Sequence, residues 1–149
     1  MKSKRFEPIQ ELASTSAKNL SRAMGEASRK VAELERQFEQ LQSYRDEYVR
    51  SSQSTGAIAA VKLQNYRMFL DRLGEALRQH TINLEAARAE YERRRALWSE
   101  KRIEAESLGR AVDRFRKEER RAADRREQRE GDDAALRVVL AARGESGST

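Results

Sequence analysis

Residues 31–48 read VAELERQFEQLQSYRDEY, and the spacing of apolar residues in this stretch decides the fold. The apolar positions advance by alternating steps of three and four, which is the period of a left-handed coiled coil. The same stepping extends toward the N-terminus, along a stripe of Ala13, Ala17, Leu20, Met24, Ala27, Val31, Leu34, Phe38, Leu41, Arg45 and Tyr48. This pattern predicts one long helix with a narrow apolar seam.

A second stripe with the same period follows a short hydrophilic segment. It consists of Ala59, Leu63, Tyr66, Leu70, Leu73, Leu77, His80, Leu84, Ala87, Tyr91, Arg94, Trp98, Lys101, Ala105, Leu108, Val112 and Phe115. Because so short a connection makes the second helix fold back on the first, the two helices are expected to be antiparallel. The predicted fold class is all-α, a long antiparallel two-helix coiled-coil hairpin with an overhanging C-terminal helix.

The helix boundaries are predicted from residues that break or cap helices. Pro8 suits a first helical turn, and the Ser/Gly-rich segment after Arg50 is typical of a turn. Gly131, followed by two aspartates, is expected to end the second helix. The predicted organisation is a hairpin domain over 1–130, with helix 1 at about 8–50, a turn at 51–56 and helix 2 at about 57–130, followed by a flexible C-terminal tail over 131–149.

The centre of this turn also predicts which residues face each other. In an antiparallel hairpin, residues at equal distances in sequence from the centre of the turn face each other. Leu34 is therefore expected opposite Leu73, Leu41 near Tyr66 and Met1 opposite Glu106. Everything after that point is expected to have no partner within the chain. An apolar stripe of Leu108, Val112 and Phe115 would then lie on the overhang and contact another protein or a second copy. Frayed disorder is the alternative, because the segment that follows is highly charged.

Composition supports a rod rather than a globule. Of the 149 residues, 38% are charged and only 6% are aromatic. The absence of Cys excludes disulfides and fits a reducing compartment. No apolar run approaches the roughly 20 residues needed to span a bilayer, and the basic N-terminus is not followed by the apolar core of a signal peptide. The protein is therefore expected to be cytoplasmic, without direct membrane insertion.

The net charge of +6 raises the possibility of a nucleic-acid partner. Acidic residues, however, are interleaved with the basic ones. Several stand four residues before a base, the order that stabilises a solvated helix, in the pairs Glu26/Lys30, Asp46/Arg50, Glu106/Arg110 and Asp113/Lys117. A solvated helical face is therefore favoured over a nucleic-acid footprint, and no nucleic acid is expected as a partner.

The sequence contains few of the residue combinations that are typical of catalytic sites. There is one His and no Cys, so neither a Cys nucleophile with a His base nor a His/Cys metal cluster can be assembled. No glycine-rich phosphate-binding motif occurs. The sequence therefore predicts a protein that is not an enzyme, with no cofactor and no metal.

Four polar residues interrupt the predicted seam. Arg45, Arg94 and Lys101 are expected to pack their aliphatic stems and direct their charges outward. His80 is expected to be a packing residue with a satisfied ring rather than a ligand.

Close to the turn, the apolar surface is wider than one seam requires. Tyr44 continues a line from Gln37 and Leu41 on the first helix. A second line on the other helix consists of Phe69, Leu73, Ala76 and His80. A contiguous surface with Tyr, Phe and His is a candidate docking site. A locally thicker core is the alternative interpretation.

The order of these motifs resembles the FliJ family of flagellar export proteins. The similar segments are ELERQFEQLQSYRDEY at 33–48, the Ser/Gly-rich turn and QNYRMFLDRLGEALRQH at 64–80. The opening residues RFEPI at 5–9 and the late segment AADRREQRE at 122–130 also look like the ends of that family. The resemblance covers nearly the whole chain.

This resemblance implies a specific role. FliJ proteins are antiparallel coiled coils, similar to the rotor stalk of rotary ATPases, that act in flagellar type III export and hence in motility and chemotaxis. The implied partners are the export ATPase hexamer, the cytoplasmic domain of the export gate and export chaperones. The resemblance also implies a monomer that is associated peripherally with the cytoplasmic face of the cell membrane at the flagellar base. The implied export-gate binding residues are Gln37, Leu41, Tyr44, Tyr48, Phe69, Leu73, Ala76 and His80.

The implied ATPase-ring contact lies at the end of the hairpin away from the turn. It would involve the start of helix 1 and the residues Leu108, Val112 and Phe115. Three other interpretations remain open: the equivalent stalk of a virulence-type III secretion system, a basic nucleic-acid-associated coiled coil, and a self-associating structural coiled coil.

Overall fold

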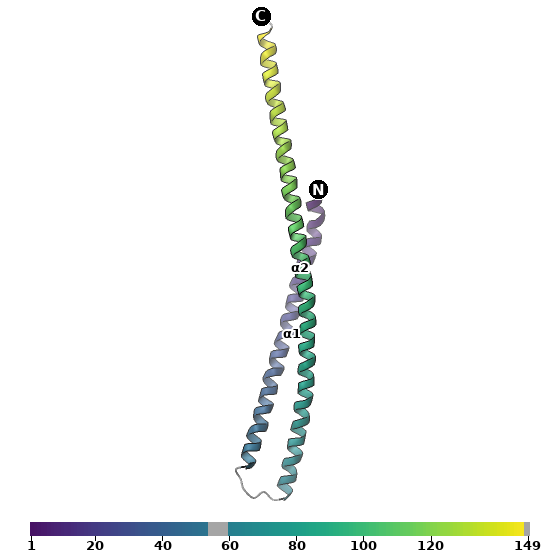
Figure 1. Ribbon diagram of the computed structural model, residues 1–149, viewed down its shortest axis with the longest axis vertical. Coiled ribbons are helices and arrows are strands. Elements are labelled where there is room, and N and C mark those ends of the chain that lie inside the picture. Colours follow the sequence, from purple (N-terminus) through teal and green to yellow (C-terminus); the bar gives the residue numbers. More distant parts are fainter. Residues whose placement is uncertain (54–59, 148–149) are drawn as a thin grey trace. The chain divides into compact units, whose positions relative to one another are not determined.

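Two long helices make up the chain in a computed structural model that describes residues 1–53 and 60–147. Helix α1 spans Lys2–Gln53 and helix α2 spans Ala60–Ser146, and the described residues contain no strand (Figure 1). Contacts divide the chain into two units. We call Ser16–Lys101 the hairpin unit, and Met1–Thr15 with Arg102–Thr149 the terminal unit. The predicted all-α fold, with two helices packed against each other, is confirmed.

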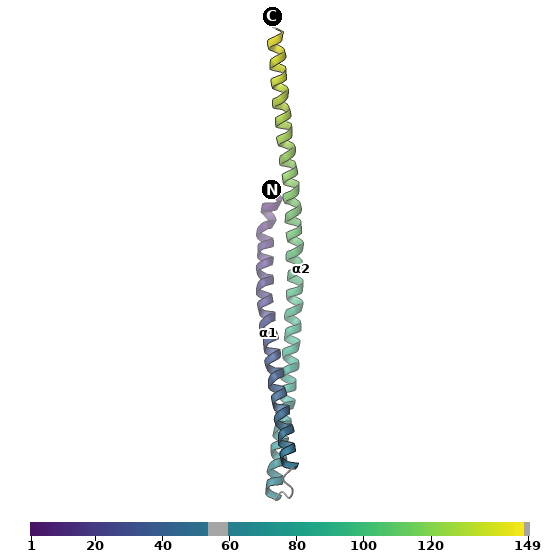
Figure 2. The same ribbon diagram turned by 90° about the vertical axis from the view of Figure 1, so that its left-hand side faces the viewer.

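In the hairpin unit, contacts between α1 and α2 follow an antiparallel order. Tyr48 stacks on Tyr66, with ring centroids 5.2 Å apart, and the carbonyl oxygen of Leu34 lies 3.2 Å from Nε2 of His80. Figure 2 shows the blue part of α1 beside the teal part of α2 in this unit. The buried seam residues are Ala27, Leu73, Leu77 and Leu84. Because each is small or aliphatic and lies on a heptad position, burial of the predicted stripe accounts for the pairing.

The predicted register within this unit is wrong. Leu34 was placed opposite Leu73, but it contacts His80, seven residues further along α2. Tyr66, placed near Leu41, instead stacks on Tyr48. The physical reason is the length of the connection. Helix α1 continues to Gln53 and α2 begins only at Ala60, so the centre of the connection lies further along the chain. Residues 51–53 of the predicted turn are helical, and 54–56 lie outside the described residues.

The terminal unit contains a second antiparallel pairing. The rings of Phe6 and Phe115 are 5.3 Å apart, and the Ser3 hydroxyl donates to Glu119 at 2.6 Å. The guanidinium of Arg116 donates to Glu7 at 2.6 Å. Ala13 and Val112 are buried here, Val112 with only 3% of its surface exposed. Val112 and Phe115 are therefore part of a helix pair and do not lie on an unpaired overhang, which corrects the prediction.

The overhang begins further along α2. All residues from 120 to 147 are exposed. Figure 1 shows the green-to-yellow end of α2 continuing beyond the N-terminus of α1 within the terminal unit. The predicted overhang therefore exists, but it starts after the pairing of Ser3 with Glu119.

Both predicted outer helix ends need correction. Helix α1 begins at Lys2, so Pro8 lies inside it, where proline removes one backbone hydrogen bond. The contacts of Ser3, Phe6 and Glu7 with α2 compensate for this loss. Helix α2 continues through Gly131 to Ser146. A single glycine costs about 1 kcal/mol, and the Ala/Leu/Arg-rich residues after Asp133 favour a helix strongly enough to offset it. Whether 131–149 moves independently stays a prediction.

Candidate functional site

An aromatic cluster joins the two helices at the end of the hairpin unit nearest the connection. The Tyr48 and Phe69 rings lie 4.5 Å apart, and Tyr44 meets Phe69 edge-on at 6.0 Å. The antiparallel pairing brings these rings together because Tyr44 and Tyr48 lie one helical turn apart on α1. The cluster therefore forms a continuous aromatic surface across both helices.

Exposure separates the eight predicted export-gate residues into surface and core. Tyr44 is 52% exposed, and Ala76 is exposed as well. Leu73, by contrast, is only 8% exposed and belongs to the seam. The remaining five are partly exposed: Gln37, Leu41, Tyr48, Phe69 and His80. An exposed aromatic surface and a locally thicker core thus coexist, with Tyr44 exposed and Leu73 buried in the seam.

Beside Tyr44, the surface of α1 is hollowed into a shallow groove of about 400 Å³. Its lining is polar except for the tyrosine and consists of Arg36, Glu39, Gln40, Ser43, Tyr44 and Glu47. An exposed aromatic ring with polar groups around it matches the anatomy of a protein-binding hot spot, in which an aromatic anchor is surrounded by a polar rim.

His80 has the environment of a satisfied packing residue, as predicted. Its ring is stacked nearly parallel to Phe38, with centroids 6.2 Å apart. When Nε2 carries the proton, it donates to the carbonyl oxygen of Leu34 at 3.2 Å. This bond ties α2 to the backbone of α1 and so supports the position of the surrounding aromatic residues.

Arg94 departs from its predicted outward orientation. Its Nη1 donates across the seam to the carbonyl oxygen of Ala23 at 2.9 Å, and its Nε donates to Glu90 at 2.9 Å. Arg93 donates to Glu90 as well. These hydrogen bonds from Arg93 and Arg94 hold the pKa of Glu90 below its usual range. Arg94 therefore links the two helices directly.

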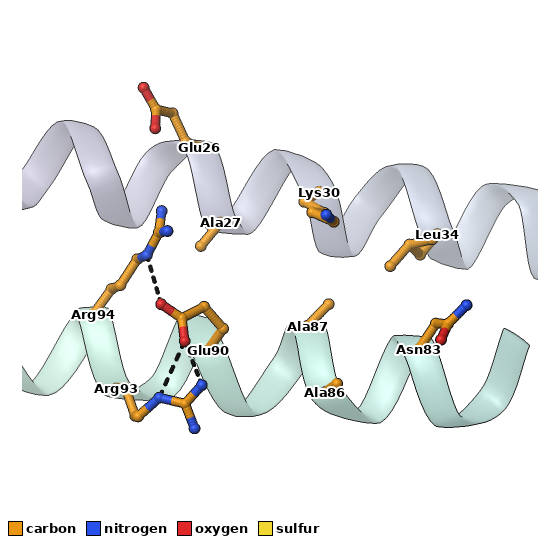
Figure 3. Close-up of a pocket in the computed structure, with 10 residues that line it drawn as sticks. All are labelled: Glu26, Ala27, Lys30, Leu34, Asn83, Ala86, Ala87, Glu90, Arg93 and Arg94. Atoms are coloured by element: carbon orange, nitrogen blue, oxygen red, sulfur yellow. Dashed lines mark hydrogen bonds and ion pairs between the residues drawn. The ribbon is translucent and has the colours of Figure 1, made fainter. Parts of the chain in front are cut away.

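Next to Arg94 is a groove of about 730 Å³ that the sequence reasoning missed (Figure 3). It arises because Ala27, Ala86 and Ala87 are too short to fill the space between the helices. Charged and amide side chains border it: Glu26, Lys30, Asn83, Glu90, Arg93 and Arg94. Two consecutive alanines at 86–87 on α2, together with Ala27 on α1, were the sequence feature that could have predicted this groove.

The predicted ring-contact residues lie in the terminal unit, where α1 covers much of their surface. Phe115 packs on Phe6, Val112 is buried and Leu108 is partly exposed. The structure thus brings Val112 and Phe115 together in a helix pair instead of on a free face.

The part of the chain that the structure describes shows no cluster of three or more His, Cys, Asp or Glu side chains able to hold a metal ion. Within the same residues, no helix is long and apolar enough to cross a membrane.

Comparison with known proteins agrees with the resemblance noted in the sequence. Residues 1–144 match the family described as Flagellar FliJ protein. The chain is similar to the Flagellar FliJ protein of Salmonella typhi, with 27% identity over 138 residues that cover 91% of this chain and 93% of that relative. Among solved structures, none matches the chain.

Proposed function

Because the chain belongs to the FliJ family of flagellar proteins, we propose that it is a non-enzymatic stalk that couples the export ATPase ring to the export gate. In this role it binds the cytoplasmic domain of the gate, contacts the ATPase hexamer and escorts export chaperones. It acts as a monomer on the cytoplasmic side of the cell membrane at the flagellar base.

The aromatic surface at the end of the hairpin unit supports the gate-binding part of this proposal. Tyr44 is half exposed, yet it is held edge-on to Phe69, so its ring is presented with little freedom to lose on binding. Phe69 in turn is fixed by Tyr48. A rigid, exposed aromatic anchor is the type of residue that dominates binding energy at protein interfaces.

The ATPase-ring contact is assigned to exposed faces of the terminal unit. A partner that bound Val112 and Phe115 directly would first have to separate them from α1. Val112 and Phe115 instead stabilise the helix pair, and the partner would contact the exposed faces of that pair.

A pull-down with the cytoplasmic domain of the export gate tests the proposal. The Tyr44→Ala/Phe69→Ala variant should lose capture of the gate domain while circular dichroism shows unchanged helicity. The matched control is Ile82→Ala/Leu97→Ala, which removes two exposed aliphatic side chains from the same unit, outside the aromatic cluster. Unchanged capture by the first variant, or equal loss in both, would contradict the assignment of the site.

A further inference from the structure

Four acid–base pairs were expected to stabilise a solvated helical face, and within the part of the chain that the structure describes none of them forms a side-chain ion pair. Among residues 1–53 and 60–147, the ion pairs join other partners, such as Arg116 with Glu7 and Arg88 with Glu35. Arg50, expected to meet the carboxylate of Asp46, instead donates to the backbone oxygen of that residue. In the terminal unit, Arg110 and Lys117 consequently keep their charges uncompensated by Glu106 and Asp113.

These two residues belong to a longer basic stripe on α2. It consists of Arg110, Arg114, Lys117, Arg121 and Arg125, all of them exposed. Steps of three and four place them on one helical face. Val112 and Phe115 lie two residues from members of the stripe, so the basic face points away from the side that packs on α1.

The surface of this stripe is hollowed. A groove of about 450 Å³ is lined by three of the cations together with a hydroxyl and one carboxylate: Ser107, Arg110, Asp113, Arg114 and Lys117. In the described part of the chain, none of the five basic side chains lies within ion-pair distance of a carboxylate. Asp113, Glu118 and Asp124 lie along the edges of the stripe. The face therefore offers five cationic donors to an anionic group, with a smaller net positive charge than the five cations alone would give.

The same face becomes apolar toward the end of α2. After Gln128 and Asp132, the steps of three and four continue through Ala135, Val139 and Ala142. Large aliphatic side chains are unusually exposed here: Leu136 57%, Val138 70%, Val139 48% and Leu140 56%. Val139 lies on the line of the cations and Leu136 lies beside it, while Val138 and Leu140 lie on the two flanks of the helix. The row of cations is thus followed by an aliphatic segment, which Leu136 and Val139 represent on the same face.

We propose that this face of α2 binds the surface of an anionic lipid bilayer. The cations of the stripe meet the phosphate headgroups, and each basic side chain close to such a surface strengthens binding by roughly fivefold. The aliphatic segment enters the boundary between headgroups and acyl chains, which gives the second of the two signals that stable peripheral binding needs. Charge complementarity and the exposed aliphatic side chains together point to lipid.

Nucleic acid fits this face less well. Phosphates would satisfy the cations, but the aliphatic segment has no role on a duplex. No aromatic side chain of the stripe is available to stack on bases, since Phe115 packs against Phe6. The proposal goes beyond export-gate docking and uses different residues, so either can fail without the other.

Sedimentation of the full-length protein with vesicles tests the proposal. The vesicles contain phosphatidylcholine with about one third phosphatidylglycerol, compared with phosphatidylcholine alone, at low salt and at about 0.5 M NaCl. The Arg114→Gln/Lys117→Gln/Arg121→Gln/Arg125→Gln variant should bind the anionic vesicles at least about 100-fold more weakly. The matched control, Lys18→Gln/Arg22→Gln/Arg29→Gln/Lys30→Gln, removes four exposed positive charges from α1 and should retain binding within about fivefold.

A Leu136→Ser/Val139→Ser variant separates the two parts of the face. It should weaken binding to anionic vesicles about tenfold and make the remaining binding more sensitive to salt. Equal binding to both kinds of vesicle, or equal loss in the stripe and control variants, would overturn the proposal. So would salt-dependent binding of the stripe to duplex DNA without vesicle binding. Conversion of a dimer to a monomer by the serine variant, with vesicle binding unchanged, would assign the aliphatic segment to a second copy of the chain.

Discussion

The hairpin unit and the terminal unit both pair α1 with α2, but they use their aromatic residues differently. In the terminal unit, Phe6 and Phe115 face each other, and the surface that remains is charged. In the hairpin unit, Tyr48 and Phe69 fill the seam, while Tyr44 stands half exposed beside them. This difference is consistent with the division of roles proposed above. The hairpin unit has an aromatic surface suited to a protein partner, and the terminal unit has a charged and aliphatic surface suited to a different one.

The largest effect is expected from the seam of the hairpin unit. Leu77 is 6% exposed, so Leu77→Ala should lower the free energy of unfolding by about 3 kcal/mol through lost burial and a cavity. Leu97→Ala, at an exposed position of the same helix, should change it by less than about 0.5 kcal/mol. Urea unfolding followed by circular dichroism measures both. Equal effects of the two substitutions would show that the seam is not where the structure places it.

A smaller and more local effect is expected in the terminal unit. Phe115→Ala removes the ring that packs on Phe6 and should cost about 2 kcal/mol, since the ring is only partly buried. Hydrogen exchange should accelerate in residues 2–15 while the aromatic cluster around Tyr48 stays protected. Acceleration throughout α1 would contradict the expectation that the contact of Phe115 with Phe6 acts locally.

Replacing a glycine inside α2 is expected to raise stability instead of lowering it. The nearest atom to a Cβ built at Gly74 is the Arg78 guanidinium at 3.6 Å, which is an ordinary contact with a flexible side chain. Gly74→Ala should therefore stabilise the hairpin unit by up to about 1 kcal/mol. Loss of stability in thermal unfolding would mean that the space beside Gly74 is not free.

The smallest expected effect depends on pH. Hydrogen bonds from the Ser3 hydroxyl and backbone N–H hold the pKa of Glu119 below its usual range. A carboxylate whose pKa is lowered on folding contributes stability at neutral pH, and that contribution is lost as the pH falls through the lowered pKa. Exchange protection of residues 2–15 should therefore decrease below about pH 4. Glu119→Gln should be less sensitive to acid, and an identical acid response would exclude this carboxylate as the cause.

The fold was predictable from the sequence because heptad spacing reports directly on helix pairing. The register was not, since it depends on where each helix ends at the connection. The heptad pattern cannot show that α1 continues to Gln53. Local propensity likewise misplaced the outer ends. Pro8 is a weak start signal and Gly131 a weak stop signal when tertiary contacts or good helix formers lie beside them.

The candidate site was predictable only in part. Parallel apolar lines located the aromatic surface, but they could not show which members are buried, so Leu73 and Tyr44 received the same role. The hydrogen bond that Arg94 donates across the seam also could not be predicted from the sequence. An arginine at a seam position can direct its guanidinium toward solvent or toward the other helix, and a residue pattern does not show which backbone carbonyl accepts its hydrogen bond.

In the proposed function, Tyr44 is the exposed anchor of an export-gate docking surface. The most direct test of this role is the dissociation constant between this protein and the cytoplasmic domain of the gate, measured by calorimetry for Tyr44→Ala and for the control Leu97→Ala. Because half of the Tyr44 surface is exposed, its removal should leave the helices folded. It should weaken binding about 30-fold, as loss of a hot-spot residue worth about 2 kcal/mol does. Binding of both variants at the strength of the unmodified protein would contradict the account.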